Sequence, residues 1–170
     1  YKGTAGINAM NILLQNLFNP LNDRLEFALG DMKFREGDKV LHLVNDAEAN
    51  VFNGDLGQIV ELIAAKYTDS KQDELVMDFD GQELTYPRAE WYKITLAYAM
   101  SIHKSQGSEF STVIVPMVSS YSRMLERNLL YTAITRAKQS LILLGEERAF
   151  AQAVAVSYTH LRAHETELHL

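Results

Sequence analysis

The sequence predicts an α/β protein: a parallel sheet flanked by helices, incomplete within this chain and interrupted by an inserted small β-barrel. Three observations support this prediction. An apolar stripe with helical spacing runs through residues 7–18, short strands separated by turn residues fill positions 39–86, and apolar runs alternate with a helical stretch from residue 94 onward. We expect four segments, of which the second is the barrel: residues 1–28, 29–92, 93–154 and 155–170.

The first predicted helix begins after Thr4, whose hydroxyl can cap it, and ends at Asn19-Pro20. Its apolar residues recur at i, i+3, i+4 and i+7, a spacing that predicts one buried stripe. The stripe consists of Ile7, Met10, Leu13, Leu14, Leu17 and Phe18. Residues 21–36 are polar and mixed in character, so we expect a connector there.

Turn residues then divide the chain into short strands. Asn53-Gly54-Asp55 is a turn signal, Gly57 marks a second special backbone position, and Asp80-Gly81 is typical of a tight hairpin. The expected strands cover residues 39–44, 58–63, 74–79 and 83–86. A barrel of about sixty residues has a marginal core by itself, so we expect it to lean on the neighbouring domain.

The last part of the chain returns to alternating strands and helices. A turn through Gln106 separates the first two of these strands. The strands are expected at residues 94–97, 113–115 and 141–144, and the helices at residues 122–137 and 146–154. Together with the first helix they would form one sheet domain around the barrel. Residues 156–170 break this pattern and resemble translated adapter sequence, so we expect a non-native or disordered tail.

Composition limits the classes of function. Without cysteine, disulfides and thiolate metal sites are excluded, the histidines are too scattered for a metal site, and no apolar run is long enough to span a bilayer. The net charge is −6, but residues 93–140 carry six basic and two acidic side chains, whereas residues 45–90 carry three basic and eleven acidic ones. These balances of +4 and −8 favour phosphate contact outside the barrel.

A polar turn from Ser101 to Phe110 lies between two apolar runs, where α/β domains present backbone N–H groups to ligands. Gly107 allows a ligand to approach the backbone closely, and Glu109 can accept hydrogen bonds from a ribose. Three side chains can donate to phosphate oxygens without reading bases: Ser101, His103 and Lys104. The alternative interpretations are an ordinary strand connection for the turn and, for His103, a histidine in the core or one that supports a site residue without touching the ligand.

Arg136 follows an apolar run with helical spacing, so we expect it at the end of a helix, together with Lys138. A planar cation in that position can neutralise charge that develops on a γ-phosphate during phosphoryl transfer. The alternative is a surface arginine paired with Glu126 or Glu147. A serine hydrolase is excluded because the sequence contains no Gly-x-Ser-x-Gly motif.

Two stretches, residues 101–110 and 129–138, resemble motifs V and VI of superfamily 1 helicases, and in particular those of bacterial RecD-like ATP-dependent DNA helicases. The turn at residues 51–57 resembles the opening of the Src-homology-3-like barrel inserted in these helicases, and residues 1–8 resemble the segment ahead of that barrel. The resemblance therefore implies the second RecA-like motor domain, carrying an inserted Src-homology-3-like β-barrel.

The resemblance also implies roles for eight residues. Arg136 corresponds to the catalytic arginine finger. The residues expected at the nucleotide are Lys2, Gln106, Gly107 and Glu109. Those expected at single-stranded DNA are Ser101, His103 and Lys104.

The implied protein is a cytoplasmic, monomeric helicase of DNA repair or recombination that uses ATP and Mg²⁺ to move 5′ to 3′ on single-stranded DNA and open duplexes at junctions. No Gly-x-x-x-x-Gly-Lys-[Ser/Thr] loop or acidic Walker B strand is apparent, and the first residue is not Met. We therefore expect a fragment that is inactive without a first motor domain. The alternatives are a stand-alone DNA-binding or protein-interaction module, a relaxase–helicase fusion, and the helicase subunit of a recombination nuclease complex.

Overall fold

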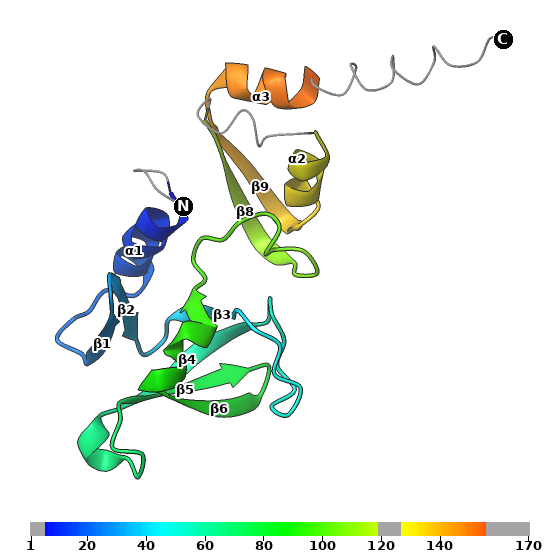
Figure 1. Cartoon of the computed structure of the whole chain (residues 1–170). Coiled ribbons are helices and arrows are strands. Elements are labelled where there is room, and N and C mark those ends of the chain that lie inside the picture. Colours follow the sequence, from blue (N-terminus) through cyan, green and yellow to red (C-terminus); the bar gives the residue numbers. More distant parts are fainter. Residues whose placement is uncertain (1–5, 119–126, 156–170) are drawn as a thin grey trace. The chain divides into compact units, whose positions relative to one another are not determined.

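The computed structural model describes residues 6–118 and 127–155, which fall into two compact units (Figure 1). The first unit extends to Ser101 and contains the barrel, and the second begins at Ile102. The predicted cap at Thr4 and the predicted tail lie outside the described residues, apart from the end of the last helix.

The barrel is built on a five-stranded antiparallel sheet whose strand order is β6-β5-β4-β3-β7. Its strands are β3 (Lys39–His42), β4 (Leu56–Ile63), β5 (Glu74–Phe79), β6 (Gln82–Pro87) and β7 (Ile94–Leu96). Two short 3₁₀ helices complete it, η1 (Ala65–Tyr67) and η2 (Arg88–Lys93). The strands expected from residue 39 to residue 86 are confirmed.

The predicted turn residues act as expected. Asp80 and Gly81 both have positive φ, +53° and +90°, as the tight turn between β5 and β6 requires. Gly57 is special for another reason: a Cβ there would lie 2.8 Å from the ring of Phe79 and from the carbonyl oxygen of Asp78. The side chain of Phe79 therefore occupies the space that a larger residue at position 57 would need.

The connector expected at residues 21–36 is wrong in its second half. Residues 26–35 form a hairpin of β1 (Glu26–Leu29) and β2 (Met32–Arg35), which pair in antiparallel register. Phe27 and Phe34 face each other in this register and are buried against Trp91, with ring centroids 5.7 and 5.9 Å from the Trp91 ring. Burial of these two rings stabilises the hairpin. The polar residues around them are the reason that the sequence did not predict it.

The first helix, α1 (Ile7–Phe18), ends where predicted, but its N-cap is Gly6 instead of Thr4, and the prediction of its buried face is wrong. Leu13, Leu17 and Phe18 are exposed, whereas Asn11 and Gln15 are buried. The reason is that Asn11 and Gln15 form hydrogen bonds to other residues of the first unit, and aliphatic side chains cannot form such bonds.

The strand expected at residues 94–97 is present as β7, but it belongs to the barrel sheet. It pairs with β3 through Val40 opposite Leu96. The α/β sheet therefore does not begin with this strand, which closes the barrel instead.

The second unit contains a parallel pair of strands and two helices: β8 (Phe110–Met117), α2 (Arg127–Ile134), β9 (Ala137–Gly145) and α3 (Glu147–Ala155). Buried residues from β8 and both helices form its core: Val115, Met117, Leu130, Ala133, Ala149 and Ala153. The helix expected to reach residue 137 ends earlier, because Ala137 already pairs with Phe110 as the first residue of β9. Residues 122–126 of that expected helix lie outside the described residues.

Candidate nucleotide and DNA site

The predicted motif V turn leads into β8 and is stabilised by local hydrogen bonds. The Ser105 hydroxyl is buried and donates to the Ile102 carbonyl over 2.8 Å, and the Ser108 N–H donates to the Ser105 carbonyl over 3.1 Å. Gly107 has a φ of +85°, and no heavy atom lies within 4 Å of the place where its Cβ would be. The turn therefore needs glycine for its backbone conformation and leaves open space beside that residue.

Arg136 lies beside this turn, although it is not the helical residue that we expected. It follows the end of α2, and its guanidinium donates from Nη1 to the Ser108 carbonyl over 3.2 Å. Nε donates to the Thr132 carbonyl over 3.2 Å and Nη2 to the Thr135 hydroxyl over 3.3 Å. The Phe110 N–H donates to the Arg136 carbonyl over 2.9 Å, so side chain and backbone both connect the two predicted motifs.

Glu109 and Lys138 form an ion pair of 2.9 Å at the same place, with both side chains more than half exposed. The hydrogen bond from Lys138 and its positive charge lower the pKa of Glu109, and the charge of Arg136 acts in the same direction. Such exposed pairs add little stability because water screens them. Because its pKa is lowered, Glu109 stays an ionised acceptor of hydrogen bonds to a lower pH than an unpaired glutamate.

The alternative roles for Arg136 and His103 can be compared with this geometry. None of the ion pairs in the described part of the chain includes Arg136, and Glu126 lies outside that part. His103 is exposed, so the core histidine is wrong.

The remaining predicted residues are distributed around the turn. Gln106 is exposed, whereas Ser101 and Lys104 are half-buried and interact with neighbouring groups. Ser101 is the last residue of the first unit, and Lys2 lies outside the described residues. The structure therefore brings together Gly107, Glu109 and Arg136, and leaves Lys2 without a described position.

Sequence reasoning missed a set of buried polar residues in the first unit. Asp38 is fully buried, and its carboxylate accepts four hydrogen bonds, one of them from the Tyr98 hydroxyl over 3.0 Å. Burial, together with the charge of Asp38, raises the pKa of Tyr98 to about 12. The signal in the sequence is the spacing of Asn11, Gln15 and Asn19 on one helical face.

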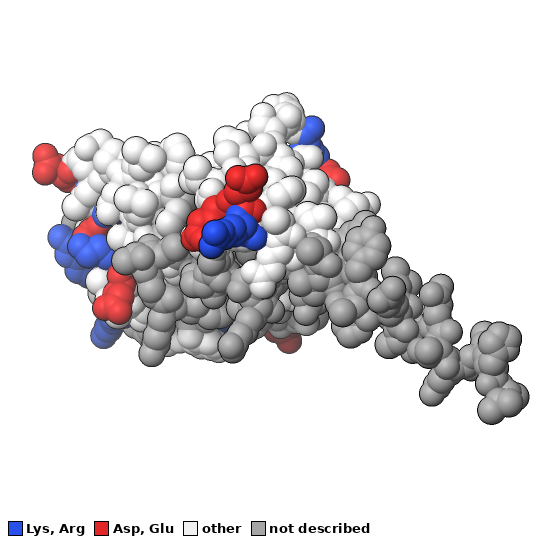
Figure 2. Space-filling view, turned by 90° about the horizontal axis from the view of Figure 1, so that it is seen from above, with Lys and Arg blue, Asp and Glu red and all other residues white. Residues whose placement is uncertain are grey.

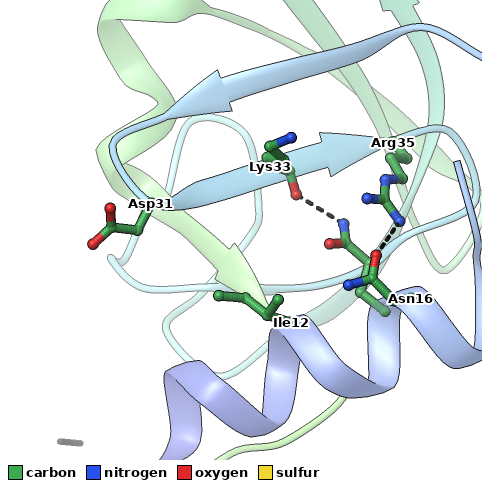
Figure 3. Close-up of a pocket in the computed structure, with 6 residues that line it drawn as sticks. Ile12, Asn16, Asp31, Lys33 and Arg35 are labelled. Carbon is green, nitrogen blue, oxygen red and sulfur yellow. Dashed lines mark hydrogen bonds between the residues drawn. The ribbon is translucent and has the colours of Figure 1, made fainter.

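A cavity in the first unit is lined in part by cations that already have partners. A cavity of about 260 Å³ lies between α1 and the β1–β2 hairpin, with Lys33 and Arg35 in its lining (Figure 3). Both cations already pair with Glu26, and Arg35 also donates to Asn16. In Figure 2 the Lys and Arg side chains lie beside Asp and Glu side chains, and the coloured residues form no broad basic area on that face.

Two absences hold for residues 6–118 and 127–155. This part of the chain contains no cluster of three or more side chains that could hold a metal ion. It also contains no helix that is long and apolar enough to cross a membrane.

Comparison with known proteins agrees with this architecture. Residues 10–79 match the SH3 domain family of ATP-dependent RecD-like DNA helicases, and residues 96–144 match the UvrD-like helicase C-terminal domain family. The fold is similar to that of a Bacteroides Pif1 helicase solved with ADP-AlF3 and single-stranded DNA, with a TM-score of 0.53, 21% identity, and coverage of 80% of this chain and 35% of that one. These matches confirm the predicted fold, an SH3-like barrel joined to a segment with the fold of a helicase C-terminal domain.

Curated relatives narrow the class. The chain is 36% identical over 154 residues to the ATP-dependent RecD2 DNA helicase of Deinococcus radiodurans, and 35% identical over 129 residues to the RecBCD enzyme subunit RecD of Mycolicibacterium smegmatis. These alignments cover 91% and 74% of this chain but only 20% and 22% of the relatives. The chain is thus similar to RecD-like helicases over most of its own length, and it spans about a fifth of the length of these relatives.

Proposed function

We propose that this segment is half of the motor of an ATP-dependent DNA helicase that moves 5′ to 3′ on single-stranded DNA and opens duplexes at junctions. In this proposal ATP binds between this segment and a first motor domain, and the segment alone does not hydrolyse it. The active protein is a monomer and acts on DNA in the cytoplasm.

One observation carries the proposal: Arg136 lies at the turn that contains Gly107. Its Nη1 donates to the carbonyl of Ser108, the residue after the glycine. A cation fixed beside an open stretch of backbone is suited to a phosphoryl group, whose charge spreads over its outer oxygens in the transition state. The alternative, in which Arg136 forms an ordinary surface ion pair, has less support from these contacts.

The described residues fit part of a nucleotide site. Gly107 leaves room for a phosphate near the backbone, Glu109 is an ionised acceptor for a ribose hydroxyl, and Arg136 supplies the positive charge. Gln106, exposed on the same turn, and Lys2 are the further nucleotide contacts we propose. ATP supplies the free energy, and Mg²⁺ neutralises phosphate charge; we assign no Mg²⁺ ligand to this chain.

The test is Arg136→Ala in the full-length protein, with Arg148→Ala as the matched control because Arg148 is exposed on α3 of the same unit. We expect ATP turnover to fall by about 10³-fold or more with little change in DNA affinity. Arg136→Lys should rescue poorly, because a single ammonium cannot reproduce the planar fork of contacts. An equal loss of DNA affinity in Arg136→Ala would contradict the finger role.

The DNA side of the proposal concerns Ser101, His103 and Lys104. Changing His103 and Lys104 together should weaken binding to single-stranded DNA and lower its dependence on salt by about one to two counterions, because fewer phosphates are neutralised. Binding measured across a salt series decides this. A parallel shift with unchanged slope would count against phosphate contact.

A further inference from the structure

The backbone just before the predicted DNA-contacting turn is anchored to α1. Tyr98 and Ala99 follow β7 and precede Ser101, and neither belongs to a helix or strand. Loops without such anchors sample many conformations, and fixing each residue is entropically unfavourable. The anchors on this segment therefore hold the backbone that leads to Ser101, the last residue of the first unit.

The first anchor is the side chain of Asn11, in the second turn of α1. Its Nδ2 donates to the Ala99 carbonyl over 2.8 Å, and the Ala99 N–H donates to its Oδ1 over 2.8 Å. One side chain thereby satisfies both backbone groups of a single residue 88 positions away in the sequence. Asn11 is buried, so water competes poorly for these bonds.

The second anchor is the Asp38 carboxylate, which receives the Tyr98 hydroxyl on Oδ1. The same oxygen accepts from Asn19 over 2.7 Å, while Oδ2 accepts from Gln15 over 2.5 Å. Gln15 lies on α1 and Asn19 is its C-terminal cap. Both anchors therefore connect the segment to the same helix. Residues 98 and 99 are thus held at adjacent positions by groups far away in the chain.

We propose that Asn11 and Asp38 are positioning residues that hold the segment 98–100 so that Ser101, the predicted DNA contact that follows it in the same unit, is preorganised for single-stranded DNA. This rests on the proposed function of that residue. Preorganisation raises affinity mainly by lowering the ordering cost of binding, with no new contact to the ligand. Loss of an anchor should therefore weaken DNA binding while leaving maximal ATP turnover unchanged.

The experiment compares Asn11→Ala with Asn8→Ala in the full-length protein. Asn8 is exposed on the same helix, so its replacement controls for the change in helix composition. Three quantities are measured: hydrogen exchange of the Ala99 amide, the single-stranded DNA concentration that half-maximally stimulates ATP turnover, and the maximal turnover. For Asn11→Ala we expect loss of Ala99 protection, about a fivefold to thirtyfold higher DNA concentration, and unchanged maximal turnover.

A second variant keeps the proposal testable if Asn11→Ala does not fold. Tyr98→Phe removes the hydroxyl and with it the bond to Asp38, and Tyr92→Phe, at an exposed tyrosine of the same unit, is its control. We expect about a twofold to fivefold rise in the half-maximal DNA concentration for Tyr98→Phe and none for Tyr92→Phe.

The outcomes separate this inference from the proposed function. If the unaltered protein has no DNA-stimulated ATP turnover, the proposed function fails, and the exchange of the Ala99 amide still decides whether Asn11 orders the segment. If the unaltered protein is active but Asn11→Ala matches Asn8→Ala in DNA response, the positioning role is overturned. Unchanged protection of Ala99 in Asn11→Ala would overturn it as well.

Discussion

Replacing Asp38 with Asn should destabilise the first unit by about 2–4 kcal/mol. The carboxylate accepts two hydrogen bonds on each oxygen: from Gln15 and the Arg35 N–H on Oδ2, and from Asn19 and Tyr98 on Oδ1. An amide keeps one acceptor oxygen and turns an NH₂ group toward the other two donors. Two bonds to a charged group, worth roughly 1.5–3 kcal/mol each, are therefore lost, and reversal of the Tyr98 hydroxyl recovers part of this.

Urea unfolding measures this change, because Trp91 is the single tryptophan of the chain and is buried in the barrel core. Its fluorescence reports the free energy of unfolding of the first unit. Asp31→Asn is the matched control, since Asp31 is exposed and the same replacement there should stay within about 0.5 kcal/mol. Equal unfolding free energies for the two variants would refute the reasoning.

Three further predictions concern single contacts. Gly57→Ala should lower the unfolding free energy by about 1–3 kcal/mol in the same urea assay, because its Cβ would overlap the ring of Phe79; no loss would mean that the barrel relaxes freely. Gly107→Ala should destabilise the second unit by about 1–2 kcal/mol from its φ of +85° alone, measured by circular dichroism during urea unfolding; a neutral result would contradict the assigned backbone conformation. Because the pKa of Glu109 is lowered in the folded state, its pairing with Lys138 stabilises above the unfolded pKa and is lost as the pH falls through the folded pKa. Lys138→Met should raise the pKa of Glu109 toward its ordinary value in a carboxyl NMR titration, and an unmoved pKa would exclude Lys138 as the cause.

The elements that the sequence predicts well are those whose signal is local. The hairpin of β5 and β6 follows from Asp80-Gly81, because two consecutive residues of positive φ form a tight turn that brings the flanking strands into antiparallel pairing. The assignment of β7 to the wrong sheet arose because pairing partners are not encoded locally. An apolar run such as Ile94–Leu96 suits either sheet, and only its pairing with β3 decides.

The buried face of α1 could not be predicted from hydrophobicity. The periodicity of its apolar residues is real, but the barrel side of the helix is decided by hydrogen bonds to Asp38 and Ala99. A buried carboxylate needs donors, and Gln15 on α1 and Asn19 at its C-terminal cap supply two of the four that Asp38 receives. Asn11, Gln15 and Asn19 have the same spacing as an apolar stripe, so a search for periodic amides near an isolated acid would have found this face.

The residues proposed for the candidate site come from the sequence motifs, whereas their contacts come from the structure. The motifs named Gly107, Glu109 and Arg136, and the structure adds that the arginine is held by Thr132, Thr135 and Ser108. A guanidinium has five N–H donors, of which these contacts use three. Arg136 can therefore stay fixed to the turn and still direct two N–H groups at a phosphate. In the proposed role, an arginine that is already oriented would lose less entropy when it engages a phosphate, so its neutral partners would support the reaction without touching the nucleotide.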